Sequence, residues 1–85
     1  MAEHPVGTVT HYYSKLEVAG IELSSELEVG DTVHILGHTS DFTQTVTSIQ
    51  IEHQTVDSAK AGDPIAIKVN ERARVHDQVL LVTPD

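Results

Sequence analysis

The segment DFTQTVTSIQIEH, residues 41–53, places the strongest constraint on how this chain can fold. Its side chains first alternate as in a half-buried strand, with Phe42 and Val46 on one face and threonines on the other. Ile49 and Ile51 then fall on the threonine face. All four apolar side chains can reach one core only if an extra residue is accommodated between Val46 and Ile49, as in a β-bulge. Because bulges bend strands at barrel corners, the segment predicts one long, bent strand of a barrel.

The rest of the sequence also favours strands, since Val and Ile supply most of the hydrophobic residues and β-branched side chains suit strands. Only residues 55–61 could form a helical turn. Eighty-five residues suit one domain, so we expect a single domain over residues 1–85 with an ordered core of about 5–83. The expected fold is all-β: a small, closed or partly open, six- to seven-stranded antiparallel β-barrel. Its strands are expected at residues 6–13, 17–23, 32–36, 42–52, 64–69 and 78–82.

A Gly-Asp pair recurs before two of these strands, in LEVGDTVHI (residues 27–35) and AKAGDPIAI (residues 59–67). Glycine adopts positive φ without steric cost, and aspartate can bond its own backbone two residues further on. Each pair therefore predicts a turn that begins a strand, and Asp31 and Asp63 are interpreted as turn residues rather than catalytic acids. A third copy, VHDQVLL, has His76 in place of the glycine, and histidine is among the residues enriched at positive φ.

The charge balance and the residue types limit the classes of function. Thirteen acidic residues against five basic ones give a formal net charge of −8, which disfavours binding to DNA and direct binding to RNA. The absence of cysteine excludes disulfides, thiolate metal sites and a cysteine nucleophile. The sequence shows neither a signal-type N-terminus nor an apolar run of about 20 residues, so we expect no membrane association and a cytoplasmic location.

Five segments, taken in order, resemble one known family. They are VGTVTHYYSKLEVAGIEL, LEVGDTVHILG, DFTQTVTSIQIEH, VDSAKAGDPIAIKV and HDQVLLV, and they extend from Val6 to Val82. They resemble the β-barrel that forms the second domain of elongation factor Tu and related translational GTPases. Within this group, the sequence is most similar to small stand-alone translation elongation factor-like proteins and to the barrel at the C-terminus of collagenase-like peptidases.

The resemblance implies a docking module. No Gly-x-x-x-x-Gly-Lys-Ser/Thr loop is present, so GTP hydrolysis is not expected. His34 and Leu36 stand where the family commonly has basic residues, and this argues against an inherited RNA-binding surface. We therefore expect a non-enzymatic binding module, without a cofactor, that engages a larger protein or ribonucleoprotein partner of the translation or RNA-modification machinery.

Two alternatives to this function stay open. The first is an accessory substrate-docking subunit or domain of a collagenase-like peptidase-type enzyme, in which another part supplies the chemistry. The second is a structural barrel that associates with copies of itself through exposed strand edges.

Two groups of polar residues have the types found in metal or catalytic sites. His34, His38 and His53 suggest zinc, but residues four apart on a strand lie about 13 Å from each other, which is too far for one ion unless a turn intervenes. Ser48, His53 and Asp57 match a serine hydrolase in type, but no nucleophile elbow surrounds Ser48. We interpret these side chains as exposed strand residues and expect no catalytic or metal site.

The cations Lys68, Arg72 and Arg74 are grouped at the end of an expected strand and in the loop that follows it. An arginine guanidinium presents a fork of donors suited to phosphate or carboxylate, so these three residues are the candidate binding site for an anionic group. The alternative is that they only balance Glu71 and Asp77.

Overall fold

Short runs of alternating apolar residues give ten strands between residues 2 and 83, the part of the chain that the computed structural model describes. All paired strands are antiparallel and no helix occurs in that range, which confirms the all-β class. Among the same residues, therefore, no helix is long and apolar enough to cross a bilayer. The strands are β1 (Ala2–Tyr13), β2 (Val18–Leu23), β3 (Leu27–Glu28), β4 (Thr32–Leu36), β5 (Asp41–Thr45), β6 (Ile49–Ile51), β7 (Gln54–Val56), β8 (Ser58–Ala59), β9 (Pro64–Lys68) and β10 (Gln78–Thr83).

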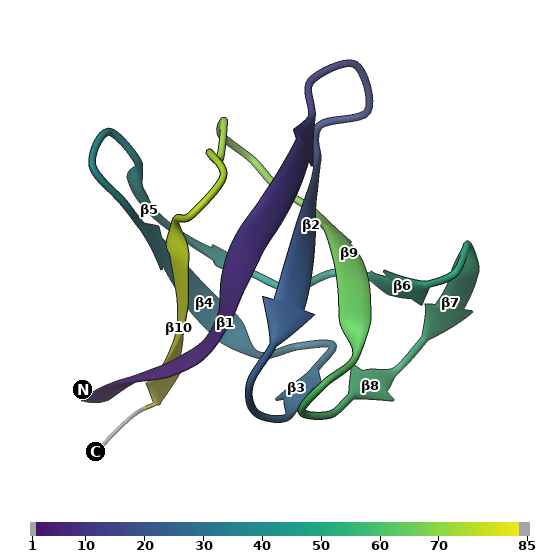
Figure 1. The fold of residues 1–85 in the computed structure, drawn as a ribbon. Coiled ribbons are helices and arrows are strands. Elements are labelled where there is room, and N and C mark those ends of the chain that lie inside the picture. Colours follow the sequence, from purple (N-terminus) through teal and green to yellow (C-terminus); the bar gives the residue numbers. More distant parts are fainter. Residues whose placement is uncertain (1, 84–85) are drawn as a thin grey trace.

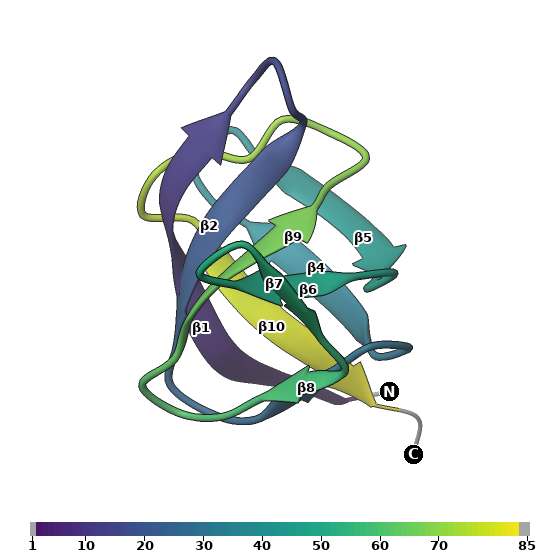
Figure 2. The ribbon, with the colours of Figure 1, turned by 90° about the vertical axis from the view of Figure 1, so that its right-hand side faces the viewer.

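Eight strands form one strongly curled sheet in the order β5-β4-β10-β1-β2-β9-β6-β7, and β3 and β8 form a separate two-stranded ribbon (Figure 1). The view turned by 90° shows how the sheet curls around (Figure 2). The expected closed or partly open barrel of six to seven strands needs correction. The sheet has eight strands, and it is not closed because β5 and β7 at its two ends do not pair with each other.

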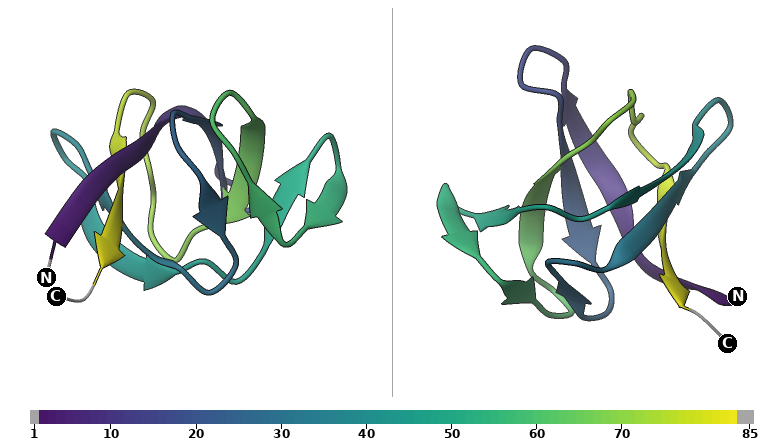
Figure 3. Two further views of the ribbon diagram at one scale, coloured as in Figure 1. Left: turned by 90° about the horizontal axis from the view of Figure 1, so that it is seen from below. Right: turned by 180° about the vertical axis from the view of Figure 1, so that it is seen from behind.

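The expectation of one long, bent strand over residues 42–52 is also wrong. Residues 46–48 are not in a strand, and they divide this segment into β5 and β6. These two strands lie toward opposite ends of the sheet, and the connection crosses between them (Figure 3). Val46 and Ile49 are both fully buried, so the change of face is real, but a connection produces it rather than a bulge. Irregular register, the sign of a bulge, occurs in β1 instead, between Pro5 and Gly7 and after Val9.

The core lies inside the curl of the sheet and is built mainly from Val and Ile. Its largest fully buried side chains are Ile21, Leu27, Ile35, Ile49 and Ile67. Every one of them comes from an inward position of a strand, as the alternation predicts. Burial of these side chains is the main source of stability in so small a domain.

The three Gly-Asp or His-Asp turns have the same geometry, which confirms the internal repeat. Residues with positive φ precede the aspartates: Gly30 (99°), Gly62 (92°) and His76 (78°). Each aspartate carboxylate accepts a hydrogen bond from the backbone N–H three residues before it, not two residues after it as expected. The pairs are Asp31 with Glu28 at 2.9 Å, Asp63 with Lys60 at 3.0 Å, and Asp77 with Arg74 at 2.8 Å.

Each turn is also fastened to another strand or connection by two backbone hydrogen bonds. The backbone N–H of the positive-φ residue donates to the carbonyl of a residue in another strand or connection. The backbone N–H of that contacted residue donates in return to the carbonyl of the turn aspartate. The residues bound in this way are Val46 by Gly30 and Asp31, Leu23 by Gly62 and Asp63, and Val9 by His76 and Asp77. The repeat therefore fixes where β4, β9 and β10 begin against the rest of the sheet.

Candidate functional site

A shallow hollow of about 450 Å³ lies on the outer face of the sheet, over β2 and β9. Its floor is open because two small residues, Gly20 and Ala66, face each other in register on the neighbouring strands. The alternation of β2 and β9 turns both residues away from the core, while Ile21 and Ile67 point inward. The absence of large side chains at the register pair thus leaves room on this face for a ligand.

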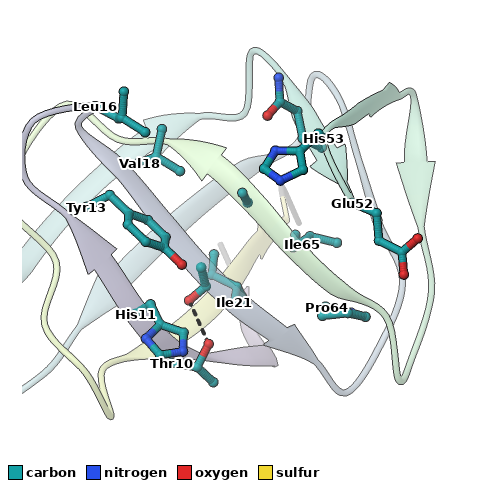
Figure 4. A pocket seen from close by; sticks show the side chains of 13 residues that line it. Thr10, His11, Tyr13, Leu16, Val18, Ile21, Glu52, His53, Pro64 and Ile65 are labelled. Carbon is teal, nitrogen blue, oxygen red and sulfur yellow. Dashed lines mark hydrogen bonds between the residues drawn. The ribbon is translucent and has the colours of Figure 1, made fainter.

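Two walls rise on either side of this floor (Figure 4). The β1 wall carries His11 and Tyr13, whose ring centroids lie 6.1 Å apart with planes tilted by 34°. The opposite wall is the turn between β6 and β7, which carries Glu52 and His53. We refer to the floor and these four wall residues together as the docking groove. Exposed Leu16 adds apolar surface beside Tyr13.

The turn that forms one wall of the docking groove has an unusual backbone. Ile51 and Gln54 pair directly, so Glu52 and His53 form a two-residue hairpin loop, and both have positive φ, at 51° and 68°. Such loops normally use Asn-Gly because glycine and asparagine tolerate positive φ, whereas most other residues lose roughly 1 kcal/mol or more there. The turn therefore presents a carboxylate and an imidazole to the groove at a cost in stability that a more common turn sequence would avoid.

The structure places Lys68 at the end of β9, and Arg72 and Arg74 in the loop between β9 and β10. Lys68 is exposed at the end of β9, and the Arg72 guanidinium carbon lies 5.9 Å from the centroid of the Tyr12 ring. The carboxylate of buried Asp77 bonds to the backbone N–H of Arg74. No ion pair found between residues 2 and 83 joins these three cations to an acid. They stay candidates for binding an anionic group.

His34 is held between two carboxylates. Its Nδ1 lies 2.9 Å from Glu3 Oε1, and its Nε2 lies 2.6 Å from Asp41 Oδ1. The hydrogen bond to Glu3 raises the pKa of His34 most, the hydrogen bond to Asp41 also raises it, and partial burial opposes both. Protonated His34, which lies on β4, therefore links β5 on one side to the start of β1 on the far side of β10.

The other histidines and hydrolase-type residues do not assemble into a site. Both ring nitrogens of His34 are bonded to carboxylates, and no group of three potential ligands within the described part of the chain could hold a metal ion. Ser48 lies in the connection between β5 and β6, His53 in the next turn, and Asp57 between β7 and β8. No hydrogen bond found among residues 2–83 joins any two of these three side chains.

The docking groove was missed by the reasoning from sequence. Alternation in β9 already turns Ala66 outward, but a hollow forms only because β2 places Gly20 opposite it. Register between strands depends on turns and on the whole sheet, so one small outward residue gave no usable signal by itself.

Comparisons of the sequence with known proteins point to peptidases. Models of protein families give no match. An uncharacterized protease of Methanocaldococcus jannaschii is 40% identical over 91% of this chain, and a collagenase of Porphyromonas gingivalis is 41% identical over 87% of it. The matched regions are 19% and 21% of those proteins, so the chain spans about a fifth of the length of the curated relatives it matches.

Two solved structures of one protein domain have a fold similar to that of this chain. The C-terminal domain of a Geobacillus thermoleovorans protein described as a "putative U32 peptidase" superposes with a TM-score of 0.89, covering 94% of this chain and 93% of that one. A selenomethionine variant of that domain gives a TM-score of 0.85, covering 89% of this chain and 96% of that one. The sequence identities are 20% and 22%, so this likeness concerns the fold.

These findings correct the expected function. The interpretation as a translation elongation factor-like module is overturned because the relatives found are a protease and collagenases. The expectation of a non-enzymatic protein is overturned by the same names, which point to an enzyme family. The comparisons support the alternative expectation: the chain is similar in sequence to part of collagenase-type peptidases, and in fold to a peptidase C-terminal domain.

Proposed function

We propose that this chain is the substrate-docking part of a collagenase-like peptidase-type enzyme. The observation that carries the proposal is the identity of 40–41% with a protease and a collagenase over nearly the whole chain. Because the match occupies about a fifth of those proteins, the enzyme in which this chain works is expected to include a further, larger part. That larger part, in the same chain or in a partner chain, is the protein partner that we propose for it.

The docking groove supports a role in holding polypeptide. Ligand-binding pockets in general combine apolar contact area with a few polar groups that fix orientation. The groove offers the face of Tyr13 and a floor of small residues, and its walls add His11, Glu52 and His53. An extended peptide lying over β2 and β9 would bury Tyr13, which is 48% exposed, without displacing any core side chain.

Filling the floor of the groove tests the proposal. Ala66→Arg places a long side chain between the two walls, whereas Ala61→Arg places the same side chain on an exposed turn between β8 and β9. We expect Ala66→Arg to weaken binding of gelatin about tenfold or more, and to slow gelatin hydrolysis by the complete enzyme, while Ala61→Arg leaves both unchanged. Equal gelatin binding and hydrolysis by the wild type and both variants, with unchanged melting temperatures, would rule out docking in the groove.

A further inference from the structure

We propose, resting on the function proposed above, that the docking groove selects short peptides whose two termini are free. The C-terminal carboxylate is held near Lys68, and the N-terminal ammonium is held near Glu22 and Glu52. The ligand class is thus the free oligopeptide of about four to five residues, which is a form that polypeptide takes when a peptidase has cut it.

The charges on β2 and β9 just beyond the two ends of the groove have opposite signs. At one end, Lys68 pairs in register with Val18, a groove-lining residue, and it follows Ala66 by two positions on the same outward face of β9. At the other end, Glu22 pairs with Pro64, so its side chain also faces outward. Glu52 lines the groove in the nearby turn. The groove is therefore polarised along the direction of β2 and β9.

The separation of these charges sets the length of the ligand. Four residue steps separate Val18, beside Lys68, from Glu22, and a strand rises about 3.3 Å per residue, so the two ends lie roughly 13 Å apart. An extended peptide has nearly the same rise, so its opposite termini match this distance when it contains about four or five residues. A longer chain crossing the groove brings uncharged amide groups, not termini, to the two ends.

The same polarity disfavours a nucleic acid as the ligand. A phosphate backbone carries negative charge along its whole length, so a strand lying in the groove would meet Glu22 and Glu52 as well as Lys68. The formal net charge of −8 adds long-range repulsion. A free peptide is complementary to both ends of the groove, because it carries one charge of each sign.

Binding of blocked peptides tests the inference. The probe is Gly-Pro-Ala-Gly with free termini, compared with its C-terminal amide and its N-acetyl form, each titrated against the 85-residue chain by calorimetry or NMR. Because each exposed charge contact is worth up to about fivefold in affinity, we expect each block to raise the Kd about three- to fivefold. Lys68→Gln should remove the effect of amidation only, and Glu22→Gln combined with Glu52→Gln should remove the effect of acetylation only.

Lys60→Gln serves as the matched control, since Lys60 is an exposed cation in the turn before β9 rather than at the groove. Equal affinity for free and blocked peptides would overturn the inference, as would tighter binding of an eight-nucleotide single-stranded DNA than of the free peptide. Loss of gelatin binding in Ala66→Arg without any dependence on termini would leave the proposed docking function standing and remove only this inference. Terminus-dependent binding that Ala66→Arg does not disturb would mean that the peptide binds outside the groove, and it would overturn both the docking function and this inference.

Discussion

Gln44 shows how one residue can take the place of missing strand pairing. It is 6% exposed on β5, at a position where alternation predicts an apolar side chain. Its Nε2 donates to the Lys68 carbonyl at 2.7 Å, and its Oε1 accepts from the Asn70 N–H at 2.7 Å. The side chain thereby ties the edge strand β5 to the end of β9, where the open sheet has no backbone ladder between the two strands.

Replacing Gln44 should destabilise the fold by removing this tie. Gln44→Leu leaves the Lys68 carbonyl and the Asn70 N–H without their partner, which is expected to cost about 2–4 kcal/mol. For a domain of this size, that loss lowers the Tm by roughly 10 °C or more. Gln44→Glu keeps the acceptor but loses the donor, so its loss should be smaller at acid pH, where the carboxyl is protonated. Thermal melts at pH 4 and pH 7 measure both effects, and a Gln44→Leu variant as stable as the wild type would contradict this account.

His34 gives the stability of the fold a predictable dependence on pH. Its folded-state pKa is raised above the ordinary value of 6.5, chiefly by the hydrogen bond to Glu3 and then by that to Asp41. A raised pKa means that the folded state favours the protonated ring, so the stabilisation is fully present below pH 6.5 and is lost as the pH rises through the folded-state pKa. Because the Asp41 side chain is 75% exposed, the gain is expected to be only about 1 kcal/mol.

The comparison of His34→Gln with wild type isolates this contribution. The wild type should melt roughly 4–8 °C above the variant at pH 6, and the difference should shrink as the pH is raised above the folded-state pKa. His38→Gln, at an exposed position in the loop between β4 and β5, is the control for the loss of a histidine. A difference in melting temperature that grows between pH 6 and pH 9 would contradict a raised folded-state pKa of His34.

At the scale of elements, the three equivalent turns hold the curled sheet in shape. Their role could be predicted from sequence because glycine and aspartate at fixed positions reflect local backbone geometry, and His76 takes up the same conformation as Gly30 and Gly62. The division between β5 and β6 could not be predicted in this way. Sequence shows that the apolar face changes after Val46, but whether a bulge or a connection causes it depends on which strands pair.

Exchanging residues at two equivalent turn positions should give effects of opposite sign. Gly62 has a φ of 92° and open space around its missing Cβ, so Gly62→Ala should lose about 1 kcal/mol through backbone strain alone. His76 has a φ of 78°, so His76→Gly should relieve strain and gain about 0.5 kcal/mol after the entropy of the unfolded chain is counted. Urea unfolding measures both. Stabilisation by Gly62→Ala would show that the turns are not equivalent.

At the scale of the whole molecule, the fold leaves one sheet face with a hollow and a separation of charge. The all-β class and the strand positions follow largely from alternation, which is a local property. The docking groove depends on Gly20 facing Ala66 and on the turn at Glu52 rising beside them, and these are long-range relationships. Of the three predicted cations, Lys68 lies on β9 two residues beyond Ala66, whereas Arg72 and Arg74 lie in the following loop, and none of the three is among the residues that line the groove.

The central claim is that this outer face holds peptide, and the backbone amide NMR spectrum of the labelled chain tests it most directly. Titration with free Gly-Pro-Ala-Gly should shift the amide signals of Gly20, Glu52 and Ala66, which surround the groove. The amide signal of Gly30, which is not among the residues that line the groove, should stay in place and serve as the internal reference. A spectrum that does not change, or shifts confined to residues 70–77, would contradict the account.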